Sequence, residues 1–269
     1  MVIISGGGSS AFCCCCLAGD LVCDGCGFIM SVILDNLTLG YDRHPAVHHL
    51  CGTFADNSLT AIIGPNGGGK STLLKAMMGL LKPLSGHIQK TGPCAVAYLP
   101  QVTEIDRSFP VSVFDMVLLG FWPVCGLWWG VTKPQRHQAL RALEAVRMES
   151  FAGRPVSVLS SGQFQRVLFA RLMVQNADVF LLDEPFAAID TRTTADLMQV
   201  LRDWHHQGKT VIAVVHDLPQ VQAFFPEVLL LARECIAWGP TPTVMTEDNL
   251  RKADTLARQW HDHGEVCAA

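Results

Sequence analysis

Three consecutive segments organise this sequence: Leu59-Thr-Ala-Ile-Ile63, Gly64-Pro-Asn-Gly-Gly-Gly-Lys70-Ser71-Thr72 and Leu73-Leu-Lys-Ala-Met-Met-Gly-Leu-Leu-Lys82. The first is an uninterrupted apolar run, which predicts a buried parallel strand, and the third predicts an amphipathic helix. The middle segment fits the pattern G-x-x-x-x-G-K-[ST]. An ordinary glycine-rich turn is the alternative, but such a turn does not require a strand before it, a helix after it and a Lys-Ser pair at its end.

The glycine-rich segment predicts a binding site for a nucleoside triphosphate. Glycines let the backbone curl so that several N–H groups converge on one anion, and the helix N-terminus adds positive potential. Lys70 can then reach the β- and γ-phosphates, while the Ser71 hydroxyl can join the shell of a Mg²⁺ ion. We expect the phosphates to contact the whole segment, which comprises Gly64, Pro65, Asn66, Gly67, Gly68, Gly69, Lys70, Ser71 and Thr72.

Length and composition favour one α/β domain with an inserted subdomain. The chain has 269 residues, of which 49% are apolar and 16% charged, so it is long and apolar enough to bury a sizeable core. The formal net charge of −4 argues against a nucleic-acid partner. Glycines and a proline interrupt the apolar stretch 111–131, which we therefore expect to dock onto another protein rather than to cross a membrane.

Residues 1–29 differ from the rest of the chain. Six of the eleven cysteines lie there, and Cys23 and Cys26 have a metal-ligand spacing. The alternative is a translated leader without a fold, with the real chain beginning at Met30. The regular pattern that starts there favours the leader. A disulfide framework is not expected, because a protein that uses ATP works in a reducing compartment.

The remaining segments predict a sheet domain with a helical insertion. Alternating apolar residues over 31–54 predict two antiparallel strands, with Tyr41 between them either stacking on an adenine ring or packing at the sheet edge. Residues 102–160 are expected to be helical. Within them Thr132 opens a helix whose buried face carries Ala139, Leu140, Leu143 and Val146.

Two further apolar strands end in polar residues that suit catalysis. Asp183 and Glu184 follow the run 179–182, and His216 follows the run 210–215. Asp183 is placed to hold Mg²⁺ through water, and Glu184 to orient or deprotonate an attacking water. Ligand and catalytic groups gather at the carboxyl ends of such strands. Taken singly, a solvated turn and a structural histidine are the alternatives.

Together these motifs resemble an ATP-binding-cassette (ABC) ATPase subunit over roughly residues 30–250. The resemblance implies an α/β P-loop NTPase fold with a RecA-like core, an N-terminal antiparallel β-subdomain and an α-helical subdomain near 102–160. The ABC domain would cover 30–245, and 246–269 would form a helical tail. The motifs occur in family order, namely Tyr41 (A-loop), Gly64–Thr72 (Walker A), Gln101 (Q-loop), Leu159–Gln163 (signature), Leu181–Glu184 (Walker B), Ala187–Asp190 (D-loop) and His216 (switch).

The resemblance also implies a mechanism. Two copies would pair head to tail and sandwich two ATP molecules, each between Walker A of one copy and the signature of the other. Glu184 would act as the base, His216 would contact the γ-phosphate, and Gln101 would sense Mg²⁺ and the membrane partner. The ligands implied for Mg²⁺ are Ser71, Gln101 and Asp183. The residues implied to contact ATP in trans are Ser160, Ser161, Gly162 and Gln163.

The signature departs from the family pattern at Ser161, where glycine is usual, and either Ser160 or Ser161 can cap the helix that follows. A serine there weakens trans binding if the position needs a positive φ or a close backbone approach.

The region 101–120 resembles the ATPases of zinc and manganese importers, which implies permease subunits, an extracytoplasmic metal-binding protein and a place on the cytoplasmic face of the cell membrane. Zinc is the preferred cargo. Manganese, an iron chelate or haem are the alternatives, and a soluble non-transport ABC ATPase is the rival from another class.

Overall fold

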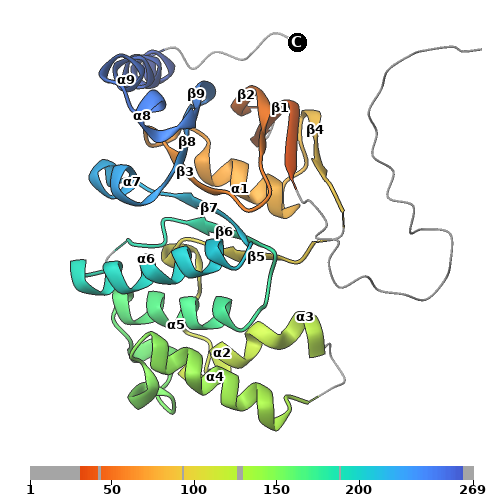
Figure 1. Cartoon of the computed structure of the whole chain (residues 1–269), viewed down its shortest axis with the longest axis vertical. Helices are drawn as coiled ribbons and strands as arrows, with labels where there is room; N and C mark the ends of the chain where they lie inside the picture. Colours follow the sequence, from red (N-terminus) through yellow and green to blue (C-terminus); the bar gives the residue numbers. More distant parts are fainter. Residues whose placement is uncertain (1–30, 42–43, 93, 126–129, 188, 263–269) are drawn as a thin grey trace, which may run out of the picture.

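The computed structural model describes residues 31–41, 44–92, 94–125, 130–187 and 189–262. The cysteine-rich segment 1–29 and the last part of the expected tail, 263–269, lie outside the described residues. Figure 1 shows two sheets in the upper half of the molecule and a group of helices below them.

A six-stranded sheet forms the centre, in the order β5-β6-β7-β3-β8-β9. Its first five strands run parallel, and β9 pairs antiparallel with β8. The apolar runs expected to be buried strands form β6, β7 and β3 in the middle of this sheet. Every residue of these three strands is buried, as expected. The strands are β5 (Val96–Leu99), β6 (Val179–Asp183), β7 (Thr210–Val214), β3 (Leu59–Ile63), β8 (Glu227–Ala232) and β9 (Glu234–Pro240).

Each face of the central sheet has its own core. Along β3, Ile62 packs towards helix α1 (Lys70–Met78) and the N-terminal sheet, while Ala61 and Ile63 face the other core. Such alternation follows from the two-residue period of a strand. The second face is covered by α5 (Ser161–Met173) and α6 (Thr191–His206), with the Phe180 and Trp204 rings stacked 3.9 Å apart.

The N-terminal sheet is antiparallel and has the order β2-β1-β4. The strands β1 (Val32–Tyr41) and β2 (His44–Phe54) match the alternating pattern, whereas β4 (Ser85–Lys90) was not expected from the sequence. Most of β4 is exposed and polar, so it carries no alternating apolar signal and forms through its backbone pairing with β1.

A group of helices between β5 and β6 packs on α5. Its main members are α2 (Val113–Leu118) and α4 (Lys133–Ala145), followed in size by α3 (Trp122–Cys125). Short 3-10 turns join them, namely η1 (Val102–Glu104), η2 (Leu119–Phe121), η3 (Glu149–Phe151) and η4 (Val156–Val158). Thr132 caps the N-terminus of α4 and forms a capping box with Gln135. The expectation for Leu140 was wrong: it is 45% exposed, because it lies 100° around the helix from Ala139 and outside the buried stripe.

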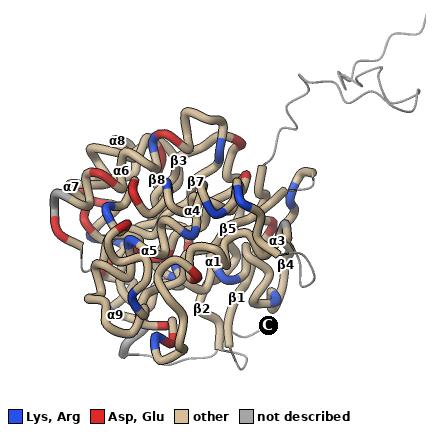
Figure 2. Tube along the Cα trace, turned by 90° about the horizontal axis from the view of Figure 1, so that it is seen from below, with Lys and Arg blue, Asp and Glu red and all other residues tan. Residues whose placement is uncertain are grey.

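The chain ends in α7 (Leu218–Phe224), α8 (Thr241–Val244) and the amphipathic α9 (Glu247–Asp262), which packs on β8 through Ala253 and its neighbours. Lys and Arg are interspersed with Asp and Glu over the described elements (Figure 2). None of the helices in the described ranges has the length and apolar character needed to span a bilayer.

Candidate functional site

The glycine-rich loop joins β3 to α1 and places its backbone at the carboxyl end of the central sheet. Gly67 and Gly69 have φ of 75° and 89°, which an L-residue rarely adopts. A Cβ on Gly69 would lie 2.4 Å from Val47 Cγ2 and 2.5 Å from the Ala46 carbonyl oxygen. At Gly67 a Cβ would meet nothing within 4 Å. Gly69 is therefore required by contact with β2 as well as by conformation.

Lys70 is the first residue of α1, and its side chain folds back into the loop. The ammonium group donates to the carbonyl oxygens of Gly64 at 2.9 Å and Pro65 at 2.7 Å. Burial lowers the pKa of Lys70, and the negative charges of Glu184 and Asp183 oppose that shift. A phosphate oxygen is a stronger acceptor for an ammonium than a neutral carbonyl is, so the same group is suited to bind an anion.

The loop opens onto a cleft of about 440 Å³ that also reaches two distant motifs. Gln101, after β5, and Glu184, after β6, line it together with the loop. The sequence predicted that these groups act on one nucleotide, and the structure brings them to one cavity. The lining comprises Ala46, Asn66, Gly67, Gly68, Gly69, Lys70, Ser71, Thr72, Gln101 and Glu184.

Glu184 is the centre of a hydrogen-bonded cluster. Gln101 donates through Nε2 to Glu184 Oε1 at 2.8 Å, and His216 Nε2 lies 2.8 Å from the same oxygen. A carboxylate only accepts, so the histidine donates. These residues follow β5, β6 and β7, which are neighbours in the sheet, and this explains why residues so far apart in sequence converge. Glu184 itself has φ of 50°, a strained conformation of the kind found at active sites.

Asp183 is a fully buried carboxylate at the end of β6. Within the described part of the chain, neither of its oxygens has a hydrogen-bond partner of normal geometry. Burial raises the pKa of Asp183, and the nearby Ser71 hydroxyl lowers it in part. Mg²⁺ is a hard cation that prefers oxygen ligands, so an unsatisfied carboxylate beside a hydroxyl suits this ion.

The signature residues lie at the start of α5. Ser160 is the cap: its Oγ accepts from the Gln163 N–H at 3.2 Å, and its own N–H donates to Gln163 Oε1 at 3.0 Å. Ser161 is the first helical residue. The lining of the 440 Å³ cleft includes neither the signature nor Tyr41, which lies 49% exposed at the end of β1. Their contacts with nucleotide stay predictions.

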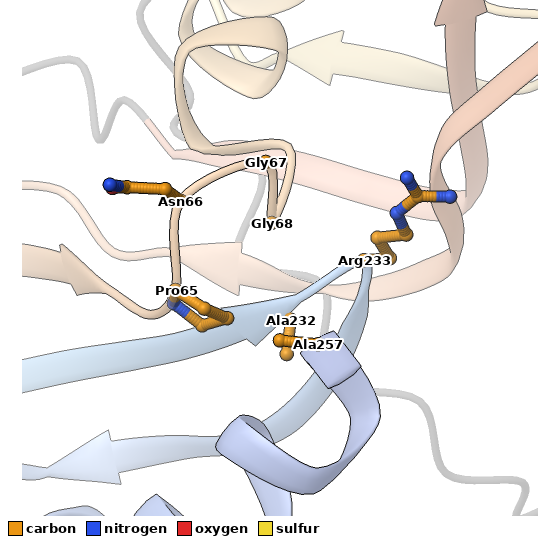
Figure 3. A pocket seen from close by; sticks show the side chains of 7 residues that line it. All are labelled: Pro65, Asn66, Gly67, Gly68, Ala232, Arg233 and Ala257. Carbon is orange, nitrogen blue, oxygen red and sulfur yellow. The ribbon is translucent and has the colours of Figure 1, made fainter. Parts of the chain in front are cut away.

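A smaller cavity of about 90 Å³ lies between the glycine-rich loop, the β8–β9 turn and α9 (Figure 3). The Arg233 backbone N–H donates to the Gly68 carbonyl oxygen at 3.0 Å. In Figure 3 the Arg233 guanidinium extends away from Asn66. The turn therefore braces the loop from outside through its backbone.

Sequence reasoning did not find two side chains near the site. Gln165 is fully buried in α5 and donates to the Pro185 carbonyl oxygen at 2.9 Å, which holds the turn after Glu184. A glutamine beside the apolar positions Phe164 and Val167 was the available signal. Arg107 contacts Ser161, and no motif marks it.

The part of the chain that the structure describes contains no group of three or more His, Cys, Asp or Glu residues arranged to hold a metal ion. Cys23 and Cys26, which have a metal-ligand spacing, lie outside that part.

Comparisons with known proteins agree on one family. Residues 47–187 match the family described as ABC transporter. The manganese transport system ATP-binding protein MntB of Listeria monocytogenes is 42% identical, over 82% of this chain and 94% of the relative. The zinc transport system ATP-binding protein TroB of Treponema pallidum is 41% identical, over 83% and 86%. A solved dimer of the ATP-binding cassette MJ0796 with ADP and Pi has a TM-score of 0.69 at 26% identity, covering 78% of this chain and 98% of that one.

Proposed function

The chain belongs to the ABC transporter family and is an ATPase of that family, and we propose that it drives the import of a divalent transition metal, zinc or manganese. The observation that carries the catalytic part is the Gln101–Glu184–His216 cluster beside the glycine-rich loop. The cargo rests on the relatives, whose names give manganese and zinc at nearly equal identity. The cargo predicted from the sequence, zinc, is therefore broadened to zinc or manganese.

In the proposed reaction the side chains that line the cleft have distinct tasks. Lys70 holds the β- and γ-phosphates, and its position inside the loop makes the charge available without a large movement. Glu184 takes the proton of the attacking water, and Gln101 orients its carboxylate through the 2.8 Å hydrogen bond. His216 donates towards the γ-phosphate as negative charge develops on it.

Mg²⁺ would be held by Ser71, Asp183 and Gln101, and it would neutralise charge on the β- and γ-phosphates. Asp183 fits this task because its buried oxygens have no other partner of normal geometry among the described residues. Most of the catalysis by this chain is then positioning and electrostatic stabilisation, as phosphoryl transfer requires.

We further propose that the chain acts as a homodimer on two permease subunits at the cytoplasmic face of the membrane, supplied by an extracytoplasmic metal-binding protein. The dimeric neighbour MJ0796 supports the first part. An open groove of about 660 Å³ between α2 and α4 supports the second, because the exposed Leu140 and the half-buried Phe114 line it beside Lys133 and Arg136. Such a surface suits a short amphipathic helix of a partner.

The cargo is tested by elemental analysis of cells that carry the wild-type chain or Glu184→Gln, grown with metals scarce. A selective fall in zinc or in manganese in the variant is the expected result and identifies the cargo. A fall in iron would keep the ATPase and replace the cargo by a chelate or haem. An unchanged content of every metal would contradict the importer.

A further inference from the structure

The segment after β5 is attached to three parts of the site by side chains spaced three residues apart. Gln101 donates to Glu184, as described above. Glu104 forms an ion pair with Lys75 of α1, with 2.7 Å between Nζ and Oε1. Arg107 donates through its terminal nitrogen to Ser161 Oγ at 3.3 Å. One short segment thus joins the Gln101–Glu184–His216 cluster, the helix of the glycine-rich loop and the signature helix.

Arg107 has a second contact that fixes its position. Its guanidinium lies over the ring of Phe164, 4.7 Å from the centroid, and Phe164 is completely buried in α5. A guanidinium that stacks on a ring and donates to a hydroxyl has little freedom left, because both contacts depend on the orientation of its plane. Arg107 is therefore held against the first turn of α5.

The partner of Arg107 is the residue at which the signature departs from its usual pattern. Glycine at position 161 would offer no side-chain acceptor, whereas Ser161 places an oxygen where Arg107 can reach it. A cation at a helix N-terminus is disfavoured by the helix dipole. Its presence therefore needs a compensating contact, which Ser161 and Phe164 supply.

We propose that Arg107 is a positioning residue for the signature helix, and that the Ser161 hydroxyl is the hydrogen-bond acceptor through which it acts. The pair ties the orientation of the signature to Gln101 and hence to Glu184, so that the signature is ordered for the nucleotide held by the second copy. This role rests on the proposed ATP-sandwiched homodimer. Among the described residues Arg107 contacts Ser161 and Phe164 rather than the glycine-rich loop, so the pair leaves the nucleotide affinity of its own P-loop unchanged.

The test measures ATP-dependent dimerisation in a Glu184→Gln background, where hydrolysis does not consume the complex. Arg107→Ala and Ser161→Ala each raise the ATP concentration for half-maximal dimer by about three- to tenfold, the effect of losing one exposed hydrogen bond of ordinary strength. The double variant needs no more ATP for half-maximal dimer than the single variant with the larger effect, because both changes remove the same interaction. Affinity for ADP, which needs only the P-loop of one copy, is unchanged.

Arg154→Ala is the matched control, because Arg154 stacks on Phe151 at 4.6 Å in the same group of helices. It should dimerise like the parent. Three results would each overturn the proposed role. Arg107→Ala could behave like this control, the effects of Arg107→Ala and Ser161→Ala could add up in the double variant, or the affinity for ADP could fall in parallel. A Glu184→Gln parent that does not dimerise with ATP would instead contradict the homodimer, and the role of Arg107 with it.

Discussion

Alanine at Gly69 and at Gly67 gives a matched pair that separates steric contact from backbone strain. Both glycines have a positive φ, so each alanine pays a left-handed penalty of about 1–2 kcal/mol. Only the Cβ at position 69 would collide with β2, at 2.4 Å and 2.5 Å. The Ala46 carbonyl belongs to the backbone and cannot rotate away, so overpacking adds about 1–3 kcal/mol.

We therefore expect Gly69→Ala to lose about 2–5 kcal/mol of unfolding free energy and Gly67→Ala about 1–2 kcal/mol. The entropic gain of alanine in the unfolded chain is common to both and cancels in the difference. Urea denaturation of the nucleotide-free chain measures the two values, provided that the m-values agree. Equal losses, or a larger loss at Gly67, would refute the contact between the loop and β2 as the cause.

Two further predictions concern the charges of the site. Burial raises the pKa of Asp183, so the buried negative charge destabilises the folded chain. This destabilisation is absent below the Asp183 pKa of the unfolded chain and complete above the Asp183 pKa of the folded chain. Asp183→Asn should therefore raise the Tm of the nucleotide-free chain at pH 7, by ~2–4 °C per kcal/mol, and should not raise it at pH 3. A Tm that is unchanged or lower at pH 7 would contradict the unsatisfied carboxylate. Lys70→Ala should lose both ATP binding and turnover, measured by titration with labelled nucleotide, and retained affinity would show that the loop carbonyls bonded to Lys70 are its real partners.

The central sheet could be predicted because its strands are buried on both faces. The runs that became β3, β6 and β7 are continuous and apolar, and the motifs at their ends carry the spacing of a nucleotide site. The polar edge strand β4 could not be predicted, since its stability comes from pairing with β1 rather than from its own side chains.

The sequence predicts the residues of the candidate site, but not the contacts among them. The order of Gln101, Glu184 and His216 follows from their motifs, whereas their meeting at one oxygen depends on the strand order β5-β6-β7. Likewise, only the backbone conformation shows that Ser160, and not Ser161, is the N-cap of α5. Arg107 carries no motif at all, and its role emerges only from the contacts with Ser161 and Phe164.

ATP hydrolysis by the purified chain, compared with that of Glu184→Gln, tests the central claim most directly. We expect Mg²⁺-dependent phosphate release by the wild type, and release at least a hundredfold slower by the variant, in line with the usual contribution of a general base of about 10²–10⁴. The variant should still bind ATP. Undiminished hydrolysis by Glu184→Gln would contradict the assignment of Glu184 as the base that its cluster with Gln101 and His216 supports.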